Sequence, residues 1–367
     1  MNYNERLLFY LLRMGLETDV DSDFRFSEEP DWKFIFNMSS EQGVLAIVFD
    51  GVEHMICNNL IPDNCLPPHA LKMQWAMNVM KIEDVYANQY RLGNELVDIF
   101  ADNGIKTIVM KGIALAVMYP KANHRPCGDL DCFLMGDYDK GNKIAVEHGA
   151  AVDYEMYKHS HVMYKGFMVE NHHVLTNIKG AERNKKFERE LQKVLSDGSI
   201  VAINDTHLLA PCSLFNAIFL TVHAWQHFCP GEIGLRHICD WAMLMKYHCD
   251  DIDWQRFVEV VNIRDTKIVN FARCVSYIAH YYMAVPMPPI FNDCKKTDAL
   301  SERVLRYIMY DHKTDSTRNP HYWRRKFIIL FDRLKGNWKY KAFSDVSNLK
   351  VAYNLFYNRW CEKNPKL

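Results

Sequence analysis

Two aspartates separated by one residue, Asp129 and Asp131, stand in a run that otherwise has the pattern of a strand. Alternate residues of a strand project from the same face, so both carboxylates emerge together. Carboxylates held this way repel one another unless a divalent cation lies between them. The pair therefore indicates a metal site, and a capping or surface role is the alternative for so short a motif.

Basic residues upstream of the aspartates are suited to phosphate. Lys111 and Gly112 form a turn that opens a helix predicted over residues 112–118, where free backbone N–H groups and the helix dipole favour an anion. Arg125 lies four residues before Asp129 and offers a fork of donors to phosphate oxygens. This setting favours a metal and phosphate site over a surface role for the two aspartates.

The ordered motifs resemble the nucleotidyltransferase superfamily typified by DNA polymerase β, and more closely a bacterial family of uncharacterised nucleotidyltransferase-like proteins. The family pattern is an L-K-G helix start, an R-x-x-x-D-h-D strand and a later h-E-h-H strand. The chain supplies Met110-Lys111-Gly112, then Arg125 to Asp131, then Val169-Glu170-Asn171-His172. The resemblance covers roughly residues 40–245.

The resemblance implies a site for two Mg²⁺ ions, with Mn²⁺ as a possible substitute. Asp129 and Asp131 would bridge the two ions, and Glu170 would hold the ion that activates the acceptor. Such ions stabilise the attacking and leaving oxygens of an in-line displacement at the α-phosphate. Lys111 and the Gly112 amide would hold the β- and γ-phosphates, with the arginine of the motif assisting. The implied reaction transfers a nucleoside monophosphate from an NTP to an acceptor hydroxyl.

The third carboxylate of the motif has an alternative. Glu155 lies in a neighbouring predicted strand, but Glu170 is preferred because it occupies the family's h-E-h-H position. A surface strand residue is the other interpretation of Glu170. His172 would share the strand face of Glu170 and either position a nucleotide or acceptor or serve as a structural histidine.

Two histidines of a later helix, His223 and His227, are spaced by four residues, which can bind zinc. The metalloprotease motif H-E-x-x-H is absent, and no third ligand is obvious. We therefore expect them to pack between the helical segment and the sheet, hydrogen-bonded to Arg236 or Asp240. These last two residues are themselves four apart and compatible with a helical ion pair.

A basic stretch near the C-terminus, residues 318–341, carries eight Lys and Arg residues against one Asp, with aromatic residues interleaved. Such a stretch can bind nucleic acid through phosphate contacts and base stacking. A solvated amphipathic helix that pairs with the acidic segment 17–31 is the favoured interpretation. Nucleic acid is thus a possible partner but is not favoured, whereas an NTP and an unidentified acceptor are expected.

The order of elements predicts an α+β fold. Helices are expected over 3–15, 40–57 and from Pro68 to Gly104, and again repeatedly after residue 213, the last over 321–334. Strands are expected over 106–110, 129–135, 151–157, 161–165, 167–176 and 199–204. We expect a nucleotidyltransferase-type mixed sheet with helices over 105–205, an N-terminal helical segment over 1–104 and a C-terminal helical domain over 206–367.

Composition excludes several classes of protein. Lys and Arg number 44 against 45 Asp and Glu, which disfavours a general polyanion binder. Eleven cysteines without a C-x-x-C pair argue against a disulfide scaffold or zinc ribbon and suit a cytoplasmic protein. The start lacks a signal-peptide pattern, and residues 207–231 suit a buried helix better than a membrane span. P-loop and Rossmann motifs are missing.

The sequence thus predicts a cytoplasmic, metal-dependent nucleotidyltransferase. The alternative is a protein of the same fold without turnover, which senses a nucleotide or serves as an interaction module for nucleic acid or protein. A metal-dependent phosphohydrolase is a third and less favoured hypothesis, because paired aspartates also serve hydrolysis.

Overall fold

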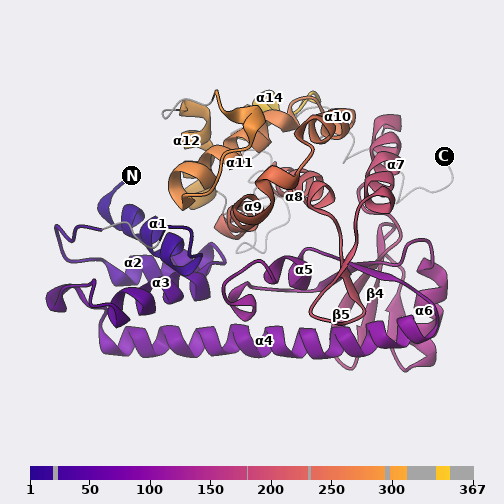
Figure 1. Cartoon of the computed structure of the whole chain (residues 1–367), viewed down its shortest axis with the longest axis horizontal. Coiled ribbons are helices and arrows are strands. Elements are labelled where there is room, and N and C mark those ends of the chain that lie inside the picture. Colours follow the sequence, from indigo (N-terminus) through magenta and orange to yellow (C-terminus); the bar gives the residue numbers. More distant parts are fainter. Residues whose placement is uncertain (20–23, 180, 230–232, 294–297, 312–335, 348–367) are drawn as a thin grey trace, which may run out of the picture.

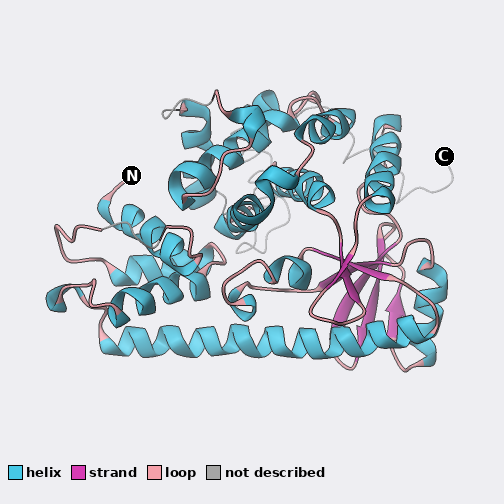
Figure 2. Ribbon diagram, viewed as in Figure 1, coloured by secondary structure: helices cyan, strands magenta, loops and turns pink. Residues whose placement is uncertain are grey.

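A computed structural model of the chain describes residues 1–19, 24–179, 181–229, 233–293, 298–311 and 336–347 (Figure 1). A seven-stranded mixed sheet lies at one end of the molecule, the first N-terminal helices lie at the other end, and one long helix runs between them (Figure 2). The predicted α+β class, with helical segments on both sides of the sheet in sequence, is confirmed.

The N-terminal segment is helical, as predicted, and contains α1 (Tyr3–Gly15), α2 (Trp32–Glu41), α3 (Leu45–Cys57), the short η1 (Asp63–Cys65) and α4 (His69–Asp102). The prediction of one helix over 40–57 was wrong at its start. Asp31 caps a separate helix, α2, and Gly43 with φ +67° turns the chain before α3. The 34 residues of α4 span about 51 Å, from these helices to the sheet (Figure 1).

Helices α1 and α3 cross at very short range because two glycines lie at the crossing. A Cβ atom on Gly51 would collide with the carbonyl oxygen of Leu11, and one on Gly15 would collide with that of Ile47. Backbone therefore packs directly on backbone at this crossing. The contact fixes α3, which supplies one of the anchors of the site.

The sheet has the strand order β3-β4-β5-β2-β1-β7-β6. Its strands are β1 (Thr107–Met110), β2 (Leu130–Phe133), β3 (Ala151–Asp153), β4 (His159–Tyr164), β5 (Phe167–His172), β6 (Val201–Ala202) and β7 (Leu208–Ala210). Between them lie α5 (Gly112–Ala116), η2 (Ala122–His124), α6 (Tyr138–Glu147) and α7 (Glu182–Asp197). At the centre, β2 pairs antiparallel with β1 and parallel with β5.

Each predicted strand is present, but several bounds differ. The strand expected over 151–157 ends at Asp153, the one expected over 161–165 begins at His159, and the one expected over 199–204 is only β6. Strand β7 was missed because it opens the uncharged run 207–231, which we interpreted as one buried helix. The rest of that run does contain the buried helix α8 (Ser213–Phe228).

The C-terminal half continues with α9 (Leu235–His248), η3 (Cys249–Asp251), α10 (Trp254–Arg264), α11 (Ile268–Met283), η4 (Pro289–Phe291), α12 (Ala299–Arg306), a π-helical turn (Tyr307–Asp311) and α14 (Asn337–Phe343). These helices share one apolar core with α1 to α3, whereas a second core lies between α4 and the sheet. Within the described ranges, no helix combines the length and apolarity that crossing a membrane requires. All nine described cysteines are free, in agreement with the prediction of reduced thiols.

Most of the basic stretch 318–341, with the helix predicted over 321–334, lies outside the described residues. Its described end forms α14, where Lys339 is buried and donates from Nζ to the Phe228 carbonyl and to the Tyr307 hydroxyl. Trp338 packs against Phe228 and Tyr307 in an aromatic cluster. At this end the expected solvated helix is thus replaced by a helix packed into the C-terminal core.

Candidate active site

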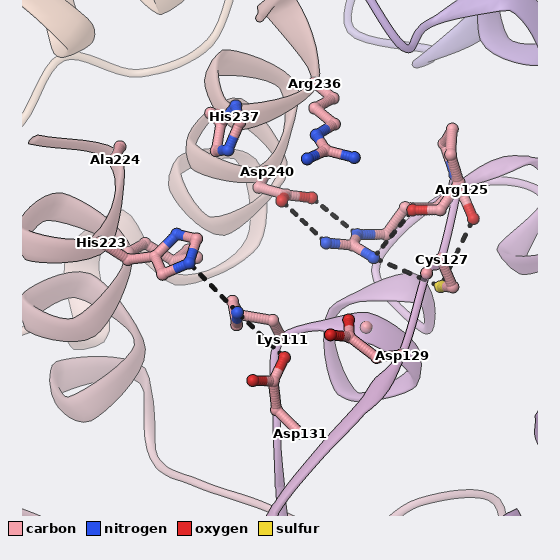
Figure 3. A pocket seen from close by; sticks show the side chains of 14 residues that line it. Lys111, Arg125, Cys127, Asp129, Asp131, His223, Ala224, Arg236, His237 and Asp240 are labelled. Carbon is pink, nitrogen blue, oxygen red and sulfur yellow. Dashed lines mark hydrogen bonds and ion pairs between the residues drawn. The ribbon is translucent and has the colours of Figure 1, made fainter. Parts of the chain in front are cut away.

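Two carboxylates meet at the centre of the sheet. The parallel pairing of β2 and β5 sets Asp131 directly opposite Glu170, so their side chains share one face. Asp131 is 6% exposed and Glu170 is half-buried. Asp129 lies just before β2, and both aspartates line a pocket (Figure 3). The alternative, Glu155, follows the end of β3 in an exposed position.

The Lys111 ammonium offsets part of the negative charge of these carboxylates. Its Nζ lies 2.9 Å from Asp131 Oδ2 and 3.1 Å from His223 Nε2, so its ammonium points between the sheet and α8 (Figure 3). Lys111 has φ +59° and ψ −146°, a conformation that costs a side-chain-bearing residue about 1–3 kcal/mol. Gly112 also has a positive φ. Helix α5 has only five residues, so the helix dipole expected to favour phosphate is weak.

Burial and neighbouring charges give the three carboxylates different pKa values. Although burial opposes ionisation, the Lys111 ammonium and the His172 ring hold the pKa of Asp131 far below its usual range. Burial and the neighbouring charges of Asp131 and Glu170 raise the pKa of Asp129. Burial also opposes ionisation of Glu170, but the hydrogen bond with His172 lowers its pKa overall. Negative charge is therefore concentrated at the inner end of the pocket.

His172 belongs to the structure of the site and not to its open surface. Its side chain is 0% exposed, and Nε2 lies 2.9 Å from Asp131 Oδ1 and 3.4 Å from Glu170 Oε2. The other ring nitrogen faces the carbonyl of Val174 at 3.3 Å. Of the two roles we considered, this burial favours the structural one, in which His172 contacts both carboxylates, over direct contact with a nucleotide or acceptor.

The sequence interpretation missed two further histidines of this face. His159 Nδ1 lies 3.4 Å from Glu170 Oε2, and His161 Nε2 lies 3.7 Å from Glu170 Oε1. Burial lowers the pKa of His159 to about 4. A signal was present: H-x-H and E-x-H stand on either side of Gly166, and a hairpin there brings both pairs to one face.

Arg125 and Asp240 form a buried bidentate pair. Arg125 donates from Nε to Asp240 Oδ1 at 2.7 Å and from Nη2 to Oδ2 at 2.8 Å, and Tyr119 donates its hydroxyl to Oδ1 at 2.7 Å. The expected fork toward phosphate is thus occupied by Asp240. The expected Arg236–Asp240 pairing is also replaced, and exposed Arg236 instead lines the pocket (Figure 3).

The N-terminal helices hold the other side of the same loop. His124 lies 2.6 Å from Asp50 of α3 through Nδ1 and 2.9 Å from Glu83 of α4 through Nε2. Gln89 of α4 donates to the carbonyl of Gly128, immediately before Asp129. The loop that leads into β2 is therefore fixed between α3 and α4 on one side and α9 on the other.

The pocket is bounded by the turn after β1, the loop before β2, and helices α8 and α9. Its wall includes the Gly112 turn and both aspartates, and Arg236 and His237 close it from α9. Acidic and basic groups thus face one another across it, as binding of a metal–phosphate complex requires.

Residues 28–284 match the model of a protein family described as uncharacterised nucleotidyltransferase. This match covers 257 of the 367 residues. The chain belongs to this family. No curated protein and no solved structure matches it.

Nucleotidyltransferases generally use a divalent metal ion, and the donors at this site fit such an ion. Asp131, Glu170 and His172 each offer one ligand atom, and these atoms lie within 4.8 Å of one another. Asp129 adds a carboxylate at the pocket wall. Carboxylate oxygens are the ligands that Mg²⁺ and Mn²⁺ prefer in proteins.

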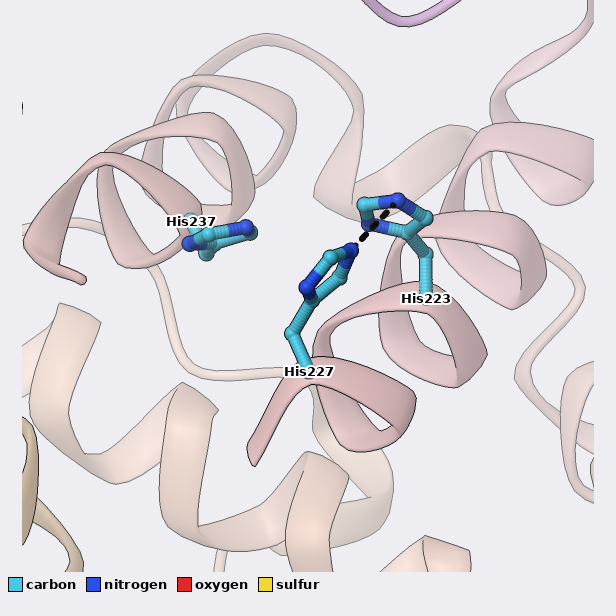
Figure 4. A group of neighbouring side chains, drawn as sticks. All are labelled: His223, His227 and His237. Carbon is cyan, nitrogen blue, oxygen red and sulfur yellow. Dashed lines mark hydrogen bonds between the residues drawn. The ribbon is translucent and has the colours of Figure 1, made fainter. Parts of the chain in front are cut away.

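A second group of histidines lies beside the same pocket, which His223 and His237 help to line. His223 Nε2 faces the Lys111 ammonium and His227 Nε2, each at 3.1 Å, which corrects the expected hydrogen bonds to Arg236 or Asp240. The sequence interpretation found no third ligand, but His237 of α9 joins the two rings of α8 (Figure 4). It was missed because no local spacing links it to α8.

Proposed function

We propose that the chain is a Mg²⁺-dependent nucleotidyltransferase that transfers a nucleoside monophosphate from an NTP to an acceptor hydroxyl. The observation that carries this proposal is the β2–β5 register, which sets Asp131 beside Glu170. Asp129 and Lys111 line the adjoining pocket. Family membership supports the reaction class and a nucleotide substrate.

In this proposal the carboxylates hold two Mg²⁺ ions, for which Mn²⁺ can substitute. Asp129 and Asp131 would hold the ions jointly, and Glu170 would hold the one on the acceptor side. When bound, the ions neutralise charge on the α-phosphate and favour ionisation of the acceptor hydroxyl. His172 keeps Asp131 and Glu170 in a fixed orientation through its buried ring.

Lys111 is the mobile cation of the proposed site. The four-carbon stem of a lysine lets its ammonium exchange one oxygen partner for another. The Lys111 ammonium, which now pairs with Asp131, would donate to the β- or γ-phosphate together with the Gly112 amide, and a bound metal ion would supply the charge that balances Asp131. Arg125 supports this arrangement indirectly, because its pairing with Asp240 holds the loop that carries Asp129. Exposed Arg236 supplies a further positive charge at the pocket wall.

The acceptor's proton needs a base near Glu170. His161 is one-third exposed and lies 3.7 Å from Glu170 Oε1, so it can accept this proton and pass it to solvent. His159 is buried and is therefore less suited than His161 to pass a proton to solvent. The acceptor would thus approach from the β4 side, and the NTP from the side of Gly112.

Transfer of a labelled nucleotide tests the proposal directly. The chain is incubated with α-labelled NTPs, Mg²⁺ and a set of acceptors that includes sugar phosphates, RNA ends and protein hydroxyls. We expect transfer by the wild-type chain and a loss of at least about 100-fold in Asp131→Asn, because the metal loses a charged ligand. The matched control is Asp84→Asn, which neutralises an exposed aspartate on α4.

Three outcomes would contradict the proposed reaction. Saturable NTP binding without transfer to any acceptor would favour the nucleotide sensor. Release of phosphate or pyrophosphate without a labelled acceptor would favour the phosphohydrolase. Equal NTP and Mg²⁺ binding by wild type, Asp129→Asn and Asp131→Asn in calorimetry would show that the site assignment is wrong.

A further inference from the structure

Three imidazoles converge beside the pocket. His223 and His227 lie one turn apart on α8, and His237 lies in the first turn of α9. One nitrogen of each ring lies within 4.8 Å of the other two (Figure 4). The ring centroids are 4.4 Å apart for His223 and His227, and 5.5 Å apart for His227 and His237.

These distances are close to those of a tetrahedral metal centre. Zinc–nitrogen bonds of about 2.0–2.1 Å place the nitrogens of neighbouring ligands about 3.4 Å apart. The Nε2 atoms of His223 and His227 are already 3.1 Å apart. His237 adds a third nitrogen within 4.8 Å of both. From these observations we propose that His223, His227 and His237 bind one divalent transition-metal ion, with Zn²⁺ as the reference ion.

The surroundings of the rings suit neutral ligands. His237 Nδ1 lies 3.2 Å from both the backbone nitrogen and the carbonyl of Gly234. In the tautomer that donates from Nδ1 to the carbonyl, Nε2 keeps its lone pair and is the ligand atom. Burial lowers the pKa of His237 to about 3, and burial followed by the charge of Lys111 lowers that of His223. Protons therefore do not compete with the ion at neutral pH.

The site has an open side. His223 and His237 both line the pocket, so the fourth position of the ion faces the same space as Asp129. The Lys111 ammonium also faces this lone pair of His223. Lys111 and a metal ion cannot share one lone pair, so the ion would displace Lys111 from His223 and leave it with Asp131. The histidine site and the carboxylates are thus coupled through Lys111.

Ligand chemistry separates the two metal sites. Three imidazole nitrogens favour Zn²⁺, Co²⁺, Ni²⁺ or Cu²⁺, whereas carboxylate oxygens favour Mg²⁺. The competing group for a transition ion is His159, His161 and Glu170 on the sheet. The test must therefore distinguish histidines of α8 and α9 from histidines of β4.

Calorimetric titration of the chelator-treated full chain with Zn²⁺, in the presence of saturating Mg²⁺, measures the proposed site. We expect one ion per chain, and an affinity at least tenfold weaker in His227→Gln and in His237→Gln. The double variant His159→Gln/His161→Gln and the control His248→Gln, whose side chain is 40% exposed, should bind as the wild type does. No binding by the wild type, or a loss that follows His159 and His161, would overturn the proposal.

A spectroscopic measurement on the wild-type chain avoids any effect of substitution on folding. X-ray absorption at the zinc edge of the one-to-one complex should show three imidazole ligands. Two or fewer imidazoles would overturn the proposal, as would a loss of imidazole ligands in the His159→Gln/His161→Gln variant, because His159, His161 and His172 all lie near Glu170 on the sheet. Neither measurement uses an NTP, so their outcome does not depend on the proposed nucleotidyl transfer.

Discussion

Arg125 and Asp240 are 115 residues apart in sequence, yet their side chains form a bidentate ion pair in which both partners are buried. The pair joins the loop before β2 to the middle of α9. It thereby connects the carboxylates of the sheet to the helices of the C-terminal half. The geometry of the pair makes Arg125 a positioning residue for the loop that carries Asp129.

Removing one partner of this pair should strongly destabilise the fold. We expect Asp240→Asn to lower the free energy of unfolding by about 3–5 kcal/mol, because the Arg125 charge then stays buried without its counter-ion. Urea denaturation measures the change. The control is Glu190→Gln, whose partner Arg256 is 31% exposed, and there we expect less than about 1 kcal/mol. Equal losses in the two variants would contradict the structural role of the buried pair.

The crossing of α1 and α3 should not tolerate even one methyl group. Gly51→Ala would push a Cβ atom into the Leu11 carbonyl, and we expect a loss of about 1–3 kcal/mol or more. Thermal unfolding measures this loss of stability. Gly128→Ala is the matched control, because a Cβ atom at Gly128 meets open space. A Gly51→Ala protein as stable as the control would refute the close crossing.

His124 should make stability depend on pH. Burial opposes protonation, but hydrogen bonds with Asp50 and Glu83 outweigh it and raise the pKa of His124 above the unfolded value near 6.5. The contribution of protonated His124 to the free energy of unfolding is therefore complete below about pH 6.5. It is lost as the pH rises through the raised pKa. We expect the wild type to lose more stability than His124→Gln between about pH 6 and 9.

Urea unfolding of both proteins across this range gives the comparison. His248→Gln serves as the control, because its partly exposed imidazole contacts only Asp251 among the ion pairs of the described chain. If the stability of the wild type and of His124→Gln changed equally with pH, His124 would not form charged hydrogen bonds with Asp50 and Glu83.

Lys111 should contribute to binding of the proposed nucleotide. Replacing Lys111 with Met removes a charge-assisted hydrogen bond worth about 1.5–3 kcal/mol, so NTP affinity in Mg²⁺ should fall about 10- to 100-fold. Calorimetry measures this change. Lys140→Met removes an exposed lysine of α6 and should bind NTP normally. Unchanged affinity in Lys111→Met would exclude Lys111 from phosphate binding.

The parts of the site that follow from local pattern were predictable from the sequence. Asp129 and Asp131 are two residues apart, as are Glu170 and His172. This spacing predicts that the two side chains of each pair share a strand face. The motif order then indicates that the two strands are neighbours. His159 and His161 obey the same rule and could have been found by placing a hairpin at Gly166.

Other parts depend on contacts between distant segments, which local pattern does not contain. Nothing in the spacing of Arg125 shows that its fork is filled by Asp240, and the sequence therefore suggested phosphate as its partner. Similarly, His237 completes a group begun by His223 and His227 only because α9 packs on α8. Strand β7 has three residues, too few to show any alternation before the apolar helix that follows.

The anchors of the loop before β2 have a practical consequence for dissecting the chain. A fragment of residues 105–205 would contain Asp129, Asp131 and Glu170 but none of the side chains of α3, α4 and α9 that hold the loop. Its metal site would lose its shape although all three acids are present. The smallest fragment that retains every anchor runs from Leu45 to His248, which lies within the span 28–284 of the family match. Activity should therefore be sought in pieces of at least that length.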